Sequence, residues 1–189
     1  MKKYIIILTL LMLSAKAWSQ DNAAKVEQAT AGVQTGFLGL WVYQESQMAD
    51  AIALRVEFGM EAGFWGNSRM GYTGYLIRPA LIAEPRWYYN LEKRLKKEKV
   101  IAYNSADFLS LKINYQPDWF RISNDDQVRT ITNISFIPTW GIRRMIGNHF
   151  NFEAGAGLGY TYIFANRAGF SANYGGTVLN LHLRIGYCF

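Results

Sequence analysis

The sequence is poor in cysteine, histidine and proline, and it has no long apolar segment after its first residues. It contains one cysteine, two histidines and four prolines among 189 residues. Because Cys188 is alone, it cannot form an internal disulfide, which excludes a disulfide-stabilised domain. The distant His149 and His182 do not have the spacing of a metal site. No later segment approaches the roughly 18 consecutive apolar residues of a transmembrane helix, which excludes a helical membrane protein.

The first residues have the pattern of a secretory signal peptide. Two lysines precede an apolar segment from Tyr4 to Leu13, and the small residues Ala17 and Ser19 follow. The apolar segment is too short to cross about 30 Å of hydrocarbon as a helix. We therefore predict a cleaved signal peptide at residues 1–19 and a single domain at residues 20–189. Without the three lysines of this leader, the formal net charge falls from +6 to about +3. That charge gives no reason to expect a nucleic-acid partner.

The rest of the chain consists largely of segments in which apolar and polar residues alternate. In the last segment, Leu, Ile, Tyr and Phe occupy the odd positions from Leu179 to Phe189. A period of two is typical of a β-strand with one apolar face. Similar alternation makes seven strand candidates, at residues 32–44, 50–64, 73–90, 104–116, 130–144, 149–164 and 178–189. The segment 45–50 between the first two is expected to be a connection.

The length of these segments and the positions of their aromatic residues favour strands that cross a membrane. Strands of soluble sheets usually have about five or six residues, whereas a tilted transmembrane strand needs about nine to eleven. Tryptophan and tyrosine are enriched where a barrel meets the two lipid–water interfaces. We predict this role for the aromatic residues near the segment ends: Trp41, Tyr43, Trp87, Tyr88, Trp140, Tyr160 and Tyr162.

The polar faces of the same segments carry charges of both signs. A soluble sandwich would turn these charges to water, whereas a closed barrel would bury them together and would have to pair them. Both architectures are compatible with the alternation, but the strand lengths, the aromatic residues and the leader favour the barrel. We therefore predict a charge network in the lumen, formed by Arg55, Glu57, Glu61, Arg78, Glu84, Arg86, Lys112, Arg143, Glu153 and Arg184.

The predicted fold class is all-β, an antiparallel up-and-down transmembrane β-barrel. Bacterial single-chain barrels have an even number of strands, so seven candidates are one too few. Either the segment 23–32 supplies a short first strand, or the strand assignment within 72–90 is wrong. We expect the former, and therefore eight strands.

Several motifs resemble a known group of proteins. The sequence EPRWYYNLEKRLKKEK is followed by NSADFLSL and later by PTWGIRRMIGNHFNFEAGAGLGY. With the aromatic last strand, these motifs are similar to small outer-membrane β-barrel proteins of Bacteroidetes-type bacteria. The resemblance covers residues 32–189 and implies an OmpA-like eight-stranded barrel in the bacterial outer membrane. It implies outer-membrane lipids and the barrel assembly machinery as partners, with Tyr187 and Phe189 as the assembly signal. An unidentified surface partner stays open.

The residue types give little reason to expect catalysis. His182 with Ser110 or Ser135 could suggest an acyl-transfer site, but the sequence shows no geometry that would bring them together. We expect His182 to be a hydrogen-bonded lumen residue, and we predict no enzyme, cofactor or metal site.

Three functions stay open. The favoured one is a barrel with a lumen plugged by the charged network and a structural or interaction role. The second is a narrow conduit for small solutes. The third is an exported soluble barrel that binds an apolar ligand.

Overall fold

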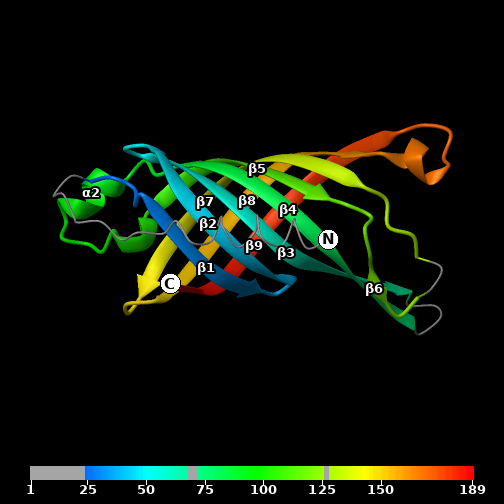
Figure 1. Cartoon of the computed structure of the whole chain (residues 1–189), viewed down its shortest axis with the longest axis horizontal. Helices are drawn as coiled ribbons and strands as arrows, with labels where there is room; N and C mark the ends of the chain where they lie inside the picture. The colour runs from blue at the N-terminus through cyan, green and yellow to red at the C-terminus, as the bar shows by residue number, and fades with distance from the viewer. Residues whose placement is uncertain (1–23, 68–71, 126–127) are drawn as a thin grey trace, which may run out of the picture.

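A computed structural model describes residues 24–67, 72–125 and 128–189 of the chain (Figure 1). The predicted signal peptide at residues 1–19 lies outside these ranges. Within the ranges, no helix is long and apolar enough to span a membrane. The strands are β1 (Ala29–Gly36), β2 (Gly39–Ala49), β3 (Ile52–Asn67), β4 (Tyr72–Trp87), β5 (Asp107–Gln116), β6 (Ile122–Ser123), β7 (Asn133–Ile146), β8 (Phe150–Ile163) and β9 (Tyr174–Cys188). The helical segments are α2 (Leu91–Leu95), η1 (Ala102–Asn104) and η2 (Ala165–Ala168).

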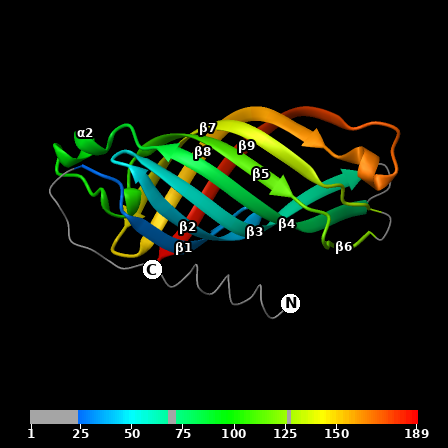
Figure 2. The same cartoon turned by 45° about the horizontal axis from the view of Figure 1, so that its top comes forward.

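The strands form one antiparallel up-and-down sheet whose pairings return to the first strand. Each long strand pairs with the next along the chain, and β1 also pairs with β9 (Figures 1 and 2). The two-residue β6 extends the sheet locally by pairing with β4. The eight long strands are therefore joined by a ring of hydrogen bonds. This confirms the predicted all-β, antiparallel, up-and-down architecture.

The alternation of the sequence separates the two faces of the sheet. In β9, the odd-numbered residues from Leu179 to Tyr187 are exposed, whereas Arg184, Gly186 and Cys188 are buried. The same holds in β3, where Val56 and Phe58 are exposed. Successive side chains of a strand point to opposite faces, so the charged residues lie inside the ring and the apolar ones outside.

One predicted strand is in fact a hairpin. The candidate at residues 32–44 contains a turn at Phe37–Leu38, and the flanking Gly36 and Gly39 pair with each other. The expected additional first strand is β1, which overlaps the segment 23–32 only in its last residues. The two turn residues are apolar, so they continue the apolar pattern and hide the turn. Their lack of Gly, Asn or Asp explains why the sequence did not indicate it.

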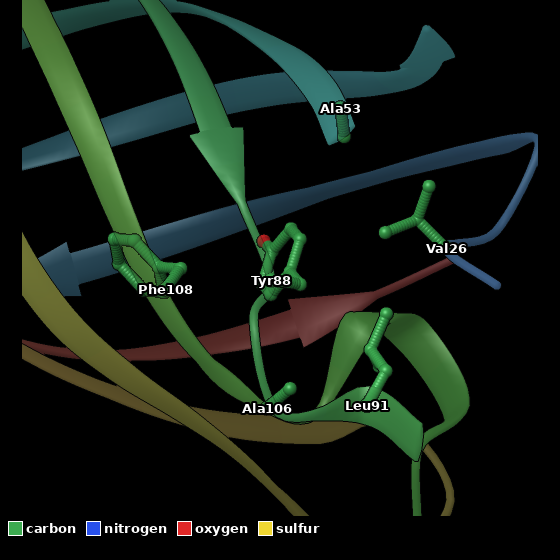
Figure 3. Close-up of a cluster of buried hydrophobic side chains, with 6 residues drawn as sticks. All are labelled: Val26, Ala53, Tyr88, Leu91, Ala106 and Phe108. Atoms are coloured by element: carbon green, nitrogen blue, oxygen red, sulfur yellow. The ribbon is translucent and has the colours of Figure 1, made fainter. Parts of the chain in front are cut away.

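A small apolar cluster lies at the end of the ring that carries α2. Figure 3 shows its six buried side chains, which come from the N-terminal segment, β3, α2, β5 and the residues flanking α2 and β5: Val26, Ala53, Tyr88, Leu91, Ala106 and Phe108. The N-terminal segment is held there by a backbone hydrogen bond from Val26 N to Asp50 O of 2.8 Å. Complete burial of one such large side chain is worth about 1.5–3 kcal/mol. The cluster therefore stabilises this end of the ring and covers the charged interior.

Candidate functional site

The interior of the ring contains a cluster of buried charged side chains, which we call the ion-pair network. In the described residues it consists of four arginines and four glutamates, so its formal charges cancel. The members come from β2, β3, β4, β7, β8 and β9: Arg55, Arg86, Arg143, Arg184, Glu45, Glu57, Glu84 and Glu153. All eight are at most 3% exposed. Buried charges persist only when they are paired and hydrogen-bonded, which is the case here.

Glu153 of β8 is the most connected carboxylate of the network. Its Oε1 and Oε2 accept hydrogen bonds from Arg86 at 2.9 and 3.0 Å. Arg143 Nε donates to Oε2 at 3.0 Å, and Arg55 Nη1 lies 3.5 Å from the same oxygen. Arginines from three other strands therefore converge on one side chain. Charge-assisted hydrogen bonds of this kind are stronger than neutral ones.

Glu45 of β2 is a second centre, closer to the apolar cluster. It accepts hydrogen bonds from Tyr88 Oη at 2.6 Å, Asn104 Nδ2 at 2.7 Å and Arg143 Nη1 at 3.0 Å. Burial raises the pKa of the Tyr88 phenol well above its ordinary value, so this group remains a donor. The residues that follow β4 and precede β5 are thus tied to the network through Tyr88 and Asn104.

Glu57 and Glu84 each bind an arginine of their own strand, and Glu57 also binds an arginine of β9. Arg184 Nη1 donates to both carboxylate oxygens of Glu57, at 3.0 and 2.9 Å, and Arg55 Nε also donates to Glu57. Glu84 accepts from Arg86 Nη2 at 2.7 Å and from Ser110 Oγ at 2.6 Å. Each carboxylate therefore has at least two donors, which compensates much of its desolvation.

Three aromatic residues that we predicted at the membrane interface lie inside the ring instead. Trp41, Tyr43 and Tyr88 are no more than 5% exposed. The guanidinium of Arg184 lies 3.9 Å from the ring centroid of Trp41, and that of Arg55 lies 3.7 Å from that of Tyr43. The prediction was wrong because it used only the position of each residue along its segment. It ignored whether the alternation places that residue on the inward or the outward face. Trp41 and Tyr43 share the inward face of β2 with Glu45 and stack on cations of the network, whereas Tyr88 donates a hydrogen bond to Glu45.

Glycines on the inward face make room for the large side chains of the network. A methyl group added at Gly59 would collide with Trp41, and one at Gly141 would collide with Phe108. A methyl group at Gly155 would meet the ring of His182. At this level the interior is therefore filled by large side chains that lie over glycines of the neighbouring strands, as expected for a ring of eight strands.

Three predicted members of the network lie apart from it, further from α2. Glu61 accepts hydrogen bonds from Asn114 and Gln116, at 3.1 and 2.5 Å to Oε2. Arg78 is the cross-strand partner of Glu61 and is half-buried. Lys112 is 5% exposed, and its Nζ lies 3.4 Å from Asn180 Oδ1. The structure thus brings seven of the ten predicted residues together and places these three in a second, looser polar group.

The candidate acyl-transfer residues have other partners. His182 Nε2 lies 3.5 Å from Glu153 Oε1, and Nδ1 lies 3.3 Å from Asn180 Nδ2. Ser110 donates to Glu84, and Ser135 donates to Thr161 Oγ1 at 3.0 Å. Over the described ranges, no group of three His, Cys, Asp or Glu side chains is placed to hold a metal ion.

Sequence reasoning missed Glu45 and the neutral polar residues that complete the network. Glu45 was placed in a connection, but β2 extends through it to Ala49. Gln34 accepts from Arg55 Nη2 at 2.6 Å and donates to Asn151 Oδ1 at 2.8 Å. The available signal was that Trp41, Tyr43 and Glu45 fall on the same side of the alternation. If the strand continued past Gln44, the charge of Glu45 would have indicated that this side faces inward.

The remaining predicted aromatic residues face outward. Trp87, Trp140, Tyr160 and Tyr162 are exposed, as are Tyr187 and Phe189. Trp87 and Trp140 both pair with Leu109, one on each side, near the end of the ring that carries α2. Tyr160 and Tyr162 lie toward the other end of β8. Whether they meet a lipid–water interface stays a prediction.

Chemically, the network is a neutral, hydrogen-bonded cluster of ion pairs inside the ring. Its cations are paired with carboxylates, and its carboxylates accept two or more hydrogen bonds. No protein-family model matches the chain, and a comparison with curated proteins finds no match.

Proposed function

We propose that the chain is a non-enzymatic outer-membrane β-barrel with a lumen plugged by the ion-pair network and a structural or interaction role. The observation that carries this proposal is the inverted polarity of the ring. The largest fully buried side chains include Arg55, Arg86 and Arg143. Leu181 and Leu183, by contrast, are 69% and 59% exposed. Water does not favour this arrangement, whereas a lipid environment does.

The exposed apolar residues are spread around the ring rather than gathered in one patch. They occur on β3, β5, β7, β8 and β9, and include Val56, Phe58, Leu109, Leu111, Phe136, Leu158, Leu179, Leu181, Leu183 and Ile185. An apolar patch that binds one protein partner would occupy one side only. A ring that satisfies its backbone groups internally and is apolar all round suits a bilayer. The exposed aromatic residues toward both ends are consistent with interfacial anchoring.

The leader pattern and the resemblance of the motifs support the outer membrane as the location. A cleaved signal peptide at residues 1–19 would export the chain, and outer-membrane lipids would cover the apolar face. The barrel assembly machinery would then read the last strand, which ends with Tyr187 and Phe189. These are the partners that we propose, together with an unidentified surface partner at the outer loops.

The two other functions fit the interior less well. A conduit needs a continuous water-filled path, but Arg55, Arg86 and Arg143 reach across the ring to carboxylates of other strands. A soluble barrel that binds an apolar ligand needs an apolar interior and a polar exterior. The described interior has the opposite polarity.

Fractionation of cells that express the full chain, followed by a detergent gel of boiled and unboiled membranes, tests this proposal. We expect the protein in the outer-membrane fraction, with migration that changes on heating because an intact barrel resists detergent. A chain that lacks residues 1–19 is the control and should not reach that fraction. Full-length protein in the soluble periplasm, without a heat-dependent shift, would contradict the proposal.

A further inference from the structure

The β1–β2 hairpin is shorter than its neighbours, so two strands run on without a partner on one side. β1 pairs with β9 only from Gly36↔Arg184 to Gly32↔Cys188, although β9 begins at Tyr174. The ladder of β2 with β3 ends at Gly39↔Glu61, although β3 continues to Asn67. Within the described residues, one further bond joins the hairpin to β3, from Ala62 N to Leu38 O.

The wall of the ring is therefore interrupted between residues 174–183 of β9 and residues 62–67 of β3. We call this interruption the wall opening. In Figures 1 and 2 the blue β1–β2 hairpin ends well short of the β3–β4 hairpin and of the red and orange β8–β9 hairpin. The opening lies on the side of the ion-pair network that faces away from α2.

The interior beside the opening is not filled. Gly176 of β9 and Gly63 of β3 both lie on the inward face, one on each side of the opening. A methyl group added at either glycine would meet no atom within 4 Å. This differs from Gly59 and Gly155 at the level of the network, where an added methyl group would collide with side chains. Gly63 is exposed and Gly176 is partly exposed, so the free space at both borders is open to the outside of the ring.

A buried ammonium group reaches the β9 border of the opening and makes no direct ion pair with a described carboxylate. Lys112 is 5% exposed; the carboxylates of Glu61, Glu57 and Glu84 attract its charge from a distance, but none of the described carboxylates forms a direct ion pair with it. Its Nζ reaches across the ring to Asn180 Oδ1, at the long distance of 3.4 Å. Asn180 belongs to the β9 segment that borders the opening. A buried charge that makes no direct ion pair is only partly compensated, so this ammonium is suited to receive an anion that enters from that side.

The outer surface beside the opening is apolar. On β9, Leu179, Leu181 and Leu183 point outward and are 63%, 69% and 59% exposed. A molecule that carried its charge to Lys112 would therefore pass its remaining length over leucine side chains. The local chemistry combines an anion site inside with an apolar path outside.

We propose that the wall opening binds a single-chain amphiphile with an anionic head, such as a fatty acid or a lysophospholipid. The carboxylate or phosphate pairs with Lys112 beside Asn180, and the acyl chain leaves between β9 and β3 along the leucines. An eight-stranded ring has room for one small ligand at most, which favours one chain over two. A strand from a second protein could pair with the free edge of β9, but it would leave the ammonium of Lys112 without a direct ion pair. The proposal goes beyond the structural role and depends only on the ring and its opening.

Photolabelling tests this proposal directly. The full mature protein, reconstituted in phospholipid nanodiscs, is exposed to a palmitic acid analogue with a diazirine in mid-chain, and labelled residues are mapped by mass spectrometry. We expect labels concentrated in residues 174–183 rather than on outward residues of β5 such as Leu111. Lys112→Met should reduce this labelling about tenfold, because one charge-assisted hydrogen bond is lost. Unlabelled palmitate or lysophosphatidylglycerol should compete, whereas acetate or inorganic phosphate should not.

A second variant keeps the test decisive if Lys112→Met does not fold. Gly176→Trp places a large ring at the border of the opening, where an added Cβ would meet no atom within 4 Å, and leaves Lys112 intact, so it should also reduce the labelling. Leu111→Trp adds the same ring on the outer face of β5 and should leave labelling unchanged. Heat-dependent gel migration verifies that each variant is folded.

Three results would overturn the proposal. Labels spread evenly over the outward faces, and unchanged in both variants, would indicate ordinary surrounding lipid only. Equal competition by phosphate alone would indicate an anion site without a place for an acyl chain. Cross-links between residues 174–183 of two copies, with labelling lost on dimerisation, would show that the free edge of β9 pairs with a second chain.

Discussion

At the scale of single residues, the main feature is that the central charges of the ion-pair network each depend on several others. Glu153 binds Arg86 and Arg143 directly, and Arg143 in turn binds Glu45. A buried ion pair is weak evidence for net stability, because burial costs roughly what pairing returns. Removal of one partner is different, because it leaves an uncompensated charge in a medium of low polarity. Substitution of Glu153, which binds the most arginines, should therefore lower the stability most.

Glu153→Gln is expected to lower the free energy of unfolding by about 3–5 kcal/mol, because it leaves Arg86 and Arg143 short of a negative partner. The substitution preserves the shape of the side chain, so the effect reports the charge. Urea titration of the protein folded in phospholipid vesicles measures this change.

The matched control is Glu92→Gln on the exposed α2. Glu92 pairs with Lys96 at 2.6 Å, and this hydrogen bond lowers the pKa of the carboxyl. The control should unfold as the unaltered protein does, because water screens the exposed pair. If Glu153→Gln is as stable as this control, the network does not contribute as the geometry implies.

At the same scale, parity predicted the charged members of the network well but not its aromatic ones. Arg55, Glu57 and Arg184 were placed inward because they alternate with apolar neighbours. Trp41 and Tyr43 were placed outward because aromatic residues are common at membrane interfaces. Their inward position follows from the arginines that stack on them, and such contacts join strands far apart in the sequence. Alternation within one strand cannot indicate which distant cation a ring will meet.

At the scale of elements, β9 combines three features in one strand. Its C-terminal part pairs with β1 and closes the ring of hydrogen bonds. Its middle part borders the wall opening, and its outward face is apolar from Leu179 onward. Strand existence and type were predictable here because the alternation is long and regular. The β1–β2 hairpin was not, because Phe37 and Leu38 continue the apolar pattern through the turn.

Phe189→Ser is expected to reduce the amount of assembled protein in the outer membrane, because the proposed assembly signal lies at the end of β9. The aromatic ring of Phe189 is exposed and touches Tyr187, with ring centroids 5.8 Å apart. The heat-shifted band on a detergent gel, quantified against total protein, measures assembly.

Phe170→Ser is the control for this substitution, since Phe170 is also exposed but lies in the connection before β9. It should assemble normally. Equal assembly of both variants would remove the role given to Phe189.

At the scale of the whole molecule, the account depends on the distribution of polarity. The ring turns charged side chains inward, where they neutralise one another, and apolar side chains outward on at least five strands. Such an exterior is stable only where it is removed from water. The sequence predicted this division because each strand alternates independently. The contacts between the inward charges depend on the register of all the strands together. The alternation of single strands therefore could not predict them.

Spin-label accessibility in phospholipid bilayers tests this central claim most directly. Single cysteines would replace Val56, Leu111, Leu158 and Leu181 in a Cys188→Ala background, with inward Ser135 as the control site. A nitroxide at each outward site should collide often with oxygen, which concentrates in lipid, and rarely with a water-soluble nickel complex. The label at residue 135 should not show this preference for oxygen. Frequent collisions with the nickel complex at all four outward sites would show that this face lies in water, and would contradict the membrane barrel.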